Sequence, residues 1–598
     1  MTTLLSNRKK VGSIRSLGSA PSLLIMFVLV IYPLGSLFLQ IIFPDVFSAH
    51  MSWHFSLQGM ARVLRNKFNL EAIFNSFWIG CVAAIISVLI GTVTAFGAMM
   101  ARGFTKTLIN TCVWIIFFAP SFVIASGWVI LLQGGGVMQQ LLHVSPNAFN
   151  WFFTPLGLFL VMGLRYFPFA HFSMSQAISN IGPEYVRAAR LLGAKPWTIF
   201  TRIWIRLLMP ALLAGATIAF AEGFGDFGLA SVITPNMQIP LVSYQIYTSL
   251  YELPVDFSSA AGLSLLVIIV TSAALIFQFW WLNRKSYGTI SGGLWSEAPV
   301  KPKTRKIIIG VALVIVLLGL ILPFGATLVQ SFWKNSYVGF KWNNWTFANY
   351  HSALAVGSAG LGALERTAVY ALITAITVMI LGLYIGQQMT FNKSLASRIL
   401  NNVTMATIAI PGVVLGVGYV FAWNANWLSP LHLLIYGTPA CLALAYVAVH
   451  LPYAIRLQIS AMTQISPNLL TAAQILGARK NVVLRAIVLP LVLETVVSTS
   501  LIAFTGVMFE LPAASLLYPA GQPPYSVLVA HLFADFQWAS GSCLTIVGMM
   551  VVFGSYVAGN LILRKVFGKS SMAGAWGASA AASEREGIPE AQGSVTTV

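Results

Sequence analysis

The sequence predicts an all-α, polytopic membrane protein with about 12 transmembrane helices, arranged as two parallel six-helix repeats. Three observations support this class. The 598-residue chain is 58% hydrophobic and only 8% charged, whereas a soluble domain is nearer half apolar and a quarter charged. Apolar runs long enough to span a bilayer, roughly 20 residues each, recur along the chain. The two halves of the sequence also resemble each other.

The apolar runs give the predicted order of spans. In the first half they lie near 22–43, 75–100, 109–133, 151–171, 208–232 and 258–283. In the second half they lie near 306–331, 366–388, 398–424, 431–455, 487–508 and 541–563. The first run is too long for the apolar core of a secretory signal peptide and no clear cleavage site follows it, so we count it as a span.

The net charge of +19 indicates membrane topology rather than nucleic-acid binding. Most Lys and Arg residues lie at the chain ends or in the gaps that follow even-numbered spans. Cytoplasmic gaps carry an excess of these residues, so the pattern places both termini in the cytoplasm. The four cysteines fall in apolar runs and indicate helix packing rather than a disulfide framework or a metal site.

The internal repeat is visible as matched segments. "PSFVIASGWV" at 120–129 matches "PGVVLGVGYV" at 411–420, an offset of 291. The segment 167–194 matches 451–478 at an offset of 284. Because each half has an even number of spans, both halves start with the same orientation, as in a parallel repeat about an axis along the membrane normal. A pathway between the halves is the expected place for a transported solute.

The predicted organisation has five parts. A cytoplasmic N-terminal segment at 1–21 precedes the first repeat at 22–283, and a basic cytoplasmic linker occupies 284–305. The second repeat covers 306–569. The small, polar tail at 570–598 is expected to be cytoplasmic and disordered.

Each repeat contains one short basic loop with a glycine near its middle, at about 173–207 and about 456–486. In the second loop, Pro467 predicts the start of a helix and Gly477 predicts the left-handed turn that ends it. Such an amphipathic element is too basic to cross the bilayer. It is expected to lie on the membrane surface or to insert its apolar side into a partner protein.

The spacing of these loops resembles the EAA loop of ABC-importer permeases: Ala-Ala, three residues, Gly, nine residues, Ile, one residue, Leu-Pro. The second loop matches at Ala472, Ala473, Gly477, Ile487, Leu489 and Pro490, and the first at Ala188, Ala189, Gly193 and Ile203. The leading Glu of the motif is replaced by Arg187 and Thr471, and the first loop has Ile205-Arg206 in place of Leu-Pro.

The resemblance implies that both loops are coupling helices, which dock in ATP-binding subunits. The residues it implies for this contact are Arg187, Ala188, Ala189, Gly193, Ala194, Thr471, Ala472, Ala473, Gly477 and Ala478. It further implies a bacterial inner-membrane permease that does the work of two subunits. Its partners would be the lipid bilayer, two cytoplasmic ATP-binding cassette subunits and an external solute-binding protein.

No phosphate-binding G-x-x-x-x-G-K-[ST] motif occurs in the chain, so ATP hydrolysis is expected in the separate subunits. We expect no catalytic residues, no cofactor and no metal site, because no nucleophile or metal-ligand pattern stands out. A rival class is an ion-coupled secondary transporter. It would explain the spans and the repeat but gives no reason for the duplicated loops.

The segments "GDFGLASVITPN" (225–236) and "VMFELPAASLLYPAG" (507–521) resemble those that follow the fifth span in fused ferric-iron permeases, which implies ferric iron as the cargo. Phosphonate, thiamine, sugar-phosphate and polyamine importers are similar and remain alternatives. The outer segments 233–257 and 511–540 contain acidic residues but no Lys or Arg, which argues against a bare anion.

Acidic residues within apolar runs are candidates for the translocation pathway, because a carboxylate at bilayer depth normally faces a cavity or a partner. They are Glu222, Asp226 and Glu510. Glu222 and Asp226 are four apart and would share a helical face, whereas Asp226 and Glu510 are equivalent in the repeat. Two interpretations are open: the acids line the pathway near its outer mouth, or each caps a broken helix or pairs with a polar neighbour.

Overall fold

The computed structural model describes residues 20–47, 51–179, 181, 184–284, 302–392 and 394–567. Nearly all of the predicted N-terminal segment, most of the linker and the predicted tail lie outside these residues. Within them there is no β-strand, only an isolated bridge between Trp333 and Trp345. Eleven of the described helices are long and apolar enough to cross a membrane, or twelve if one bent pair counts as a span. The predicted all-α, polytopic class is confirmed.

The first half contains fourteen described α-helices. They are α1 (Ala20–Met26), α2 (Tyr32–Ile42), α3 (Gln58–Arg65), α4 (Lys67–Met100), α5 (Gly103–Phe118), α6 (Ser121–Leu132), α7 (Val137–Leu142), α8 (Pro155–Ser179), α9 (Glu184–Leu191), α10 (Pro196–Ile199), α11 (Ile205–Gly225), α12 (Phe227–Met237), α13 (Val242–Tyr251) and α14 (Phe257–Asn283). Two π-helical segments continue neighbouring helices: η3 (Phe27–Ile31) joins α1 to α2, and η6 (Phe200–Trp204) joins α10 to α11.

The second half repeats this order, with a shorter connection before its helix Pro439–Thr463 than before the equivalent helix Pro155–Ser179. Its described helices are α15 (Pro302–Ser331), α16 (Ala348–Leu354), α17 (Ala359–Phe391), α18 (Leu395–Ile408), α19 (Gly412–Trp423), α20 (Pro439–Thr463), α21 (Pro467–Ile475), α22 (Lys480–Val483), α23 (Leu489–Met508), α24 (Ala514–Leu517), α25 (Tyr525–Ala534) and α26 (Trp538–Phe567). The π-helical segment η9 (Leu484–Val488) lies at the position of η6.

Helix lengths confirm the internal repeat. Helices α6 and α19 have 12 residues each, at the offset of 291. Helices α8 and α20 have 25 residues each, at the offset of 284. The change in offset falls between these pairs, where the first half has the additional helix α7 and a longer connection. Insertions of this kind are tolerated in connections because they leave the packed helices undisturbed.

Two predicted spans, 109–133 and 398–424, are each broken in the structure, so the prediction of continuous helices there was wrong. Helix α5 ends before Pro120, and α18 and α19 are bent by 113° near Pro411. Proline disfavours the helical conformation in the residue before it. Ala119 is accordingly extended, with a ψ of 132°.

The predicted span at 208–232 was also wrong in its extent. Helix α11 ends at Gly225, and α12 begins only after Asp226, whose backbone is extended with φ −69° and ψ 106°. Glu222 and Asp226 therefore do not share the face of one helix, because the helical path is interrupted between them.

The first helix of each repeat packs against the other repeat. Helix α2 lies on α19, and α15 lies on α4 and α6. The Tyr32 hydroxyl donates a hydrogen bond to the Ala422 carbonyl at 2.8 Å, and the Tyr419 hydroxyl donates to the Leu29 carbonyl at 2.9 Å. Each bundle therefore contains one helix from the other repeat. The predicted boundaries of the two repeats hold along the sequence. In space, α2 and α15 each pack in the bundle of the other repeat.

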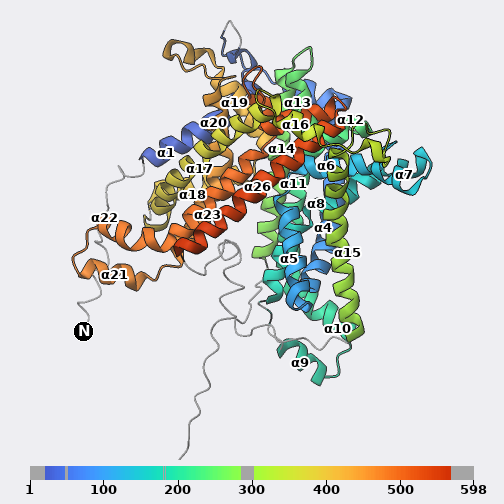
Figure 1. Cartoon of the computed structure of the whole chain (residues 1–598). Helices are drawn as coiled ribbons and strands as arrows, with labels where there is room; N and C mark the ends of the chain where they lie inside the picture. The colour runs from blue at the N-terminus through green and yellow to red at the C-terminus, as the bar shows by residue number, and fades with distance from the viewer. Residues whose placement is uncertain are drawn as a thin grey trace, which may run out of the picture.

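The two bundles form an inverted V (Figure 1). They come together near α12, α13 and α19 and diverge toward α9 and α10 on one side and α21 and α22 on the other. The short loop helices thus lie at the far ends of the two bundles, while the opposite end of the molecule joins the halves.

Candidate functional site

The two basic loops have the same backbone turn. In the first, the amide of Gly193 donates to the Arg190 carbonyl at 2.9 Å and the amide of Ala194 donates to the Ala189 carbonyl at 2.9 Å. In the second, the corresponding bonds of Gly477 and Ala478 are both 3.0 Å long. This pair of bonds defines a Schellman helix end, which requires a left-handed residue. Gly193 and Gly477 supply it with φ of +74° and +84°, as predicted for Gly477.

Apolar clusters fix each loop to the end of its bundle that lies away from the junction of the two halves. In the first half, Val186 and Ile199 of the loop pack with Met174 and Ile178 of α8, and Ala189 and Ala194 cover this cluster. In the second half, Val488 packs with Met462 and Val492, and Leu470 and Leu484 cover that cluster. Both loops are therefore packed onto their bundles through apolar side chains.

The tips of the loops expose large apolar side chains. Leu191 and Leu192 are 89% and 87% exposed, and the repeat-equivalent Ile475 and Leu476 are 80% and 86% exposed. Exposed apolar patches of this kind mark interaction sites. The sequence analysis did not select these four residues, although a pair of large apolar residues before each loop glycine was the available signal.

The structure brings the predicted contact residues together around these tips. Arg187, Ala188, Thr471, Ala472, Gly193 and Gly477 are exposed, whereas Ala189, Ala194 and Ala478 are half-buried and Ala473 is buried. The second alanine of each Ala-Ala pair faces its bundle, and its carbonyl accepts the hydrogen bond from the amide of the residue that follows the glycine. That position therefore stabilises the turn, while its neighbours present the exposed face.

Asp226 caps α12 at the break after α11. Its carboxylate accepts hydrogen bonds from the Leu229 amide at 3.1 Å, the Ser121 hydroxyl at 2.7 Å and the Tyr166 hydroxyl. An aspartate at this position satisfies amide groups that the helix start leaves without partners. Ser121 and Tyr166 were not selected from the sequence, because nothing local links them to Asp226.

Glu510 occupies the equivalent break in the second half, just before α24. It accepts hydrogen bonds from the amides of Ala513 at 2.9 Å and Ala514 at 3.0 Å, and its side chain is 8% exposed. Gly412 stands where the first half has Ser121. The longer glutamate thus reaches two backbone donors where the aspartate uses one amide and two hydroxyl groups.

Glu222 differs from the other two acids because its side chain is exposed. It lies on α11, close enough to Arg165 of α8 and to Tyr453 of α20 for electrostatic interaction. Tyr453 belongs to the second half. Glu222 therefore lies at the interface between the halves, where its carboxylate is not held by a helix cap.

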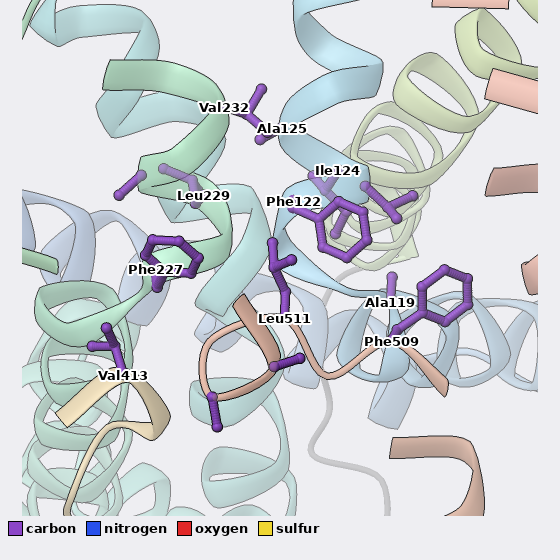
Figure 2. Packing of buried hydrophobic residues seen from close by; sticks show 14 of the residues in the cluster. Ala119, Phe122, Ile124, Ala125, Phe227, Leu229, Val232, Val413, Phe509 and Leu511 are labelled. Carbon is purple, nitrogen blue, oxygen red and sulfur yellow. The ribbon is translucent and has the colours of Figure 1, made fainter. Parts of the chain in front are cut away.

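An apolar plug fills the interface where the bundles meet (Figure 2). Phe122 of α6 and Leu511 after α23 lie in it with exposures of 1% and 2%. The ring centroids of Phe122 and Phe509 are 6.1 Å apart, and Phe227 and Val413 belong to the same cluster. Residues of both halves thus close the molecule at this end, on the side away from the loops.

Comparison with known proteins gives the family. The model of the family described as "binding-protein-dependent transport system inner membrane component" matches the chain twice, at residues 87–285 and 378–565. Each match includes one of the basic loops and one of the helix breaks at Asp226 and Glu510. These matches cover well over half of the chain.

Individual relatives agree with this doubling. A ferric transport system permease protein of Actinobacillus pleuropneumoniae is 24% identical over 561 residues, covering 91% of this chain and 78% of the relative. A protein of Haemophilus influenzae, also named for ferric transport, is 26% identical over 517 residues, covering 84% and 78%. The sulfate transport system permease protein of Escherichia coli is 27% identical over 280 residues, covering 46% of this chain but 95% of the relative.

The sulfate relative therefore corresponds to about one repeat, whereas the two ferric relatives extend over both. The doubled match, the many membrane-length helices and the paired loops agree with one another. They describe a multi-pass inner-membrane transport permease rather than an enzyme. The chain belongs to the family of binding-protein-dependent transport system inner membrane components.

Proposed function

We propose that this chain forms the whole membrane-spanning part of an ATP-driven importer that carries ferric iron into the bacterial cytoplasm. The observation that carries the proposal is the pair of loops with the same Schellman turn and the same exposed apolar tip. Two such tips suit two ATP-binding cassette subunits, one on each loop. An external solute-binding protein delivers the cargo at the end closed by the apolar plug.

The loops couple ATP binding to transport through their packing. When the two ATPase subunits close on ATP, they draw the two loops toward each other. Because Val186 and Ile199 tie the first loop to α8, and Leu470 and Leu484 tie the second to Met462 of α20 and Val492 of α23, each loop carries its bundle with it. The inner ends then approach and the plugged end is free to open.

The pathway runs between the bundles, with Glu222, Asp226 and Glu510 beside it. Glu222 has the strongest support, since its exposed carboxylate lies near Tyr453 of the other half. Asp226 and Glu510 shape the outer mouth by holding the two helix breaks in place. Negative charge along the pathway favours a cationic cargo over an anionic one.

Ferric iron as the cargo is supported by the two relatives that extend over both repeats, whose names refer to ferric transport. The outer segments 233–257 and 511–540, which contain acids but no Lys or Arg, support a cation. They give little support to a phosphonate or a sugar phosphate. Thiamine or a polyamine, both cationic, is the second candidate. The secondary-transporter alternative has no support in a family that depends on binding proteins.

The orientation in the membrane follows the basic residues. Both loops and both termini face the cytoplasm, as the distribution of Lys and Arg favours. The apolar plug and α13 then face the outside. This orientation places the exposed loop tips where cytoplasmic ATPase subunits can reach them.

The test is uptake of radioactive ferric iron by cells that lack the gene, with and without the restored chain. We expect uptake to fall on deletion, to return with the chain, and to stop when ATP is depleted. Loss of thiamine or polyamine uptake instead would keep the importer and replace the cargo. Uptake that follows an ion gradient and survives ATP depletion would contradict the proposed class.

A further inference from the structure

Three tyrosines line one face of α13, at the end of the molecule opposite the loops (Figure 1). Tyr244, Tyr247 and Tyr251 follow the spacing i, i+3, i+7 of a single helical face. The rings of Tyr247 and Tyr251 are stacked with centroids 4.6 Å apart, and those of Tyr244 and Tyr247 are 6.1 Å apart. Three phenol groups therefore lie in a row.

The second half completes the group with Tyr436 and Tyr518. The Tyr251 hydroxyl donates to the Ser515 carbonyl at 2.6 Å, which fixes α13 against α24. The Tyr518 phenol, directly after α24, is close enough to Tyr247 and Tyr251 to interact with both electrostatically. Tyr436 is similarly close to Tyr251 and Tyr518. The tyrosine cluster, meaning these five residues, therefore spans the junction of the halves.

Three hydroxyl groups of the tyrosine cluster are available for a ligand. Among the hydrogen bonds of the described residues, none involves the hydroxyl of Tyr244, Tyr247 or Tyr518. All three side chains are half-buried, so water or a solute reaches them. The cluster thus presents several oxygen donors from two elements on opposite sides of the junction.

The charges around the cluster are negative. Glu252 directly follows α13 and is close enough to Tyr244 and Tyr247 to act on both electrostatically. His531 lies beside Tyr518, with ring centroids 6.2 Å apart, and Asp535 is near His531. The outer segments that carry these residues contain no Lys or Arg. A basic group that contacts these segments is Arg366 of α17, which donates a hydrogen bond to the Pro523 carbonyl at 3.2 Å. The carboxylates of the segments themselves attract a cation to the cluster.

Ferric ion is a hard, trivalent cation that prefers oxygen donors, and phenolate oxygen is a strong ligand for it. Among the described residues, no group of three or more His, Cys, Asp or Glu could hold a metal ion. We propose that the tyrosine cluster, with Glu252, is the site that receives the ferric cargo before it enters the pathway. This inference rests on the proposed ferric function and deepens it.

Binding at this site exchanges protons for the metal. A bound trivalent cation strongly favours the deprotonated ligand. Each phenol that binds loses its proton to water, and its new Fe–O bond takes the place of a bond between the iron and a water molecule or carrier ligand, which leaves. The oxidation state of the iron does not change.

The experiment uses the purified full-length permease with its ATPase subunits in lipid nanodiscs, titrated with ferric nitrilotriacetate. Phenolate bound to ferric ion gives a visible charge-transfer band, which other oxygen ligands do not give. We expect this band in the unmodified protein and its displacement by gallium(III). The double variant Tyr247→Phe with Tyr518→Phe should lose the band and at least tenfold in affinity.

Phenylalanine keeps the rings and removes only the hydroxyl groups, so packing is preserved. Tyr337→Phe is the matched control, since Tyr337 is a surface tyrosine with 82% exposure outside the cluster. It should keep the band and normal iron uptake. Retention of the band by the double variant would overturn the inference. The inference would also be overturned if the double variant kept its affinity for iron and lost only its binding of the external solute-binding protein.

Failure of the inference and failure of the proposed function give different results. Normal ferric uptake by cells, with no band and with full transport by the double variant, would overturn the tyrosine site alone. Absence of ferric uptake by the unmodified importer would overturn the proposed cargo. Ferric uptake that falls at least fivefold in the double variant, with ATP hydrolysis unchanged in the absence of cargo, would support both.

Discussion

Gly418 of α19 lies directly against Pro33 of α2: a Cβ atom at position 418 would be 2.8 Å from the Pro33 carbonyl oxygen. Gly127 of α6 has the same relation to Pro323 of α15, at 2.4 Å. Gly127 and Gly418 are equivalent in the repeat. Helices α2 and α15, which each pack on the bundle of the other repeat, therefore make the same contact there: a glycine of the bundle lies against the backbone of a proline.

This contact predicts that Gly418→Ala separates α2 from the second bundle. The added methyl group overlaps the backbone, and overpacking of this kind costs about 1–3 kcal/mol. We expect a lower thermal midpoint of the purified protein. Gly35→Ala, on the same helix α2 but with no atom within 4 Å of the new Cβ, should leave it unchanged. Equal midpoints for both variants would contradict the predicted role.

The loop turns predict a second effect. A Cβ atom at Gly477 would meet nothing within 4 Å, but the residue has a φ of +84°. Gly477→Ala should therefore strain only the turn, by about 1 kcal/mol, and Gly477→Val should strain it more. We expect ATP-driven uptake to fall in that order while the protein still inserts in the membrane. Gly310→Ala, in open space on α15, is the control. Normal transport by Gly477→Val would count against coupling.

The exposed loop tips predict how the ATPase subunit binds. Burying a leucine on docking is worth about 1.5–3 kcal/mol, so Leu476→Ser should weaken ATPase association by at least about tenfold. Leu395→Ser, which changes another exposed leucine, 72% exposed on α18, should not. Quantitative co-purification with the ATPase subunit measures both. Equal retention of the ATPase by the two variants would show that the tip is not in the contact.

The carboxylates predict a separation of stability from transport. Asp226→Ala removes a helix cap and should destabilise the protein by about 1–2 kcal/mol. Glu222→Gln removes an exposed charge at the interface without removing a cap, so the thermal midpoint should stay constant while uptake falls several-fold. Asp226→Asn with Glu510→Gln, assayed for uptake and cargo-stimulated ATP hydrolysis, tests the pathway role of the caps. If both activities stay unchanged, the caps are structural only.

Topology can be tested with single cysteines introduced into an otherwise cysteine-free protein. Positions in 102–106, 284–305 and 570–598 should react with a membrane-impermeant reagent only from the cytoplasmic side. Positions in 44–74 and 332–365 should react only from outside. An odd number of spans between 305 and 570 would contradict the parallel repeat.

The class, the repeat and the loops could be predicted because their signals are local. Hydropathy identifies spans from composition alone, and the spacing around Gly477 specifies a turn within a few residues. The breaks at Pro120 and Pro411 were missed because hydropathy continues through them. The break at Asp226 was foreseen only as one of two open interpretations, in which the carboxylate caps a broken helix, and the structure shows that cap. A proline or a capping aspartate within an apolar run is a weak signal when the run is long enough to span the membrane.

Long-range pairing could not be predicted. Nothing in the apolar sequence around Pro33 specifies that its partner is Gly418 rather than a helix of its own repeat. The tyrosine cluster is similar, because α13 supplies a recognisable face but Tyr436 and Tyr518 come from distant segments. The hydrogen bonds from Ser121 and Tyr166 to Asp226 likewise depend on tertiary packing. Charge at membrane depth predicted that Asp226 needed partners, but not which ones.

Because α2 and α15 each pack on the bundle of the other repeat, the two helices find their partners at different times during synthesis. Tyr32 and its acceptor, the Ala422 carbonyl, are 390 residues apart. At roughly 5–20 residues per second, the ribosome needs roughly 20–80 s to make that interval. Helix α2 must wait in the lipid for a partner that does not yet exist, whereas α15 emerges when α4 and α6 are already in place. The two halves of a nearly symmetric protein therefore assemble in an asymmetric order. The first helix pair of the chain packs fully only after α19 has been synthesised.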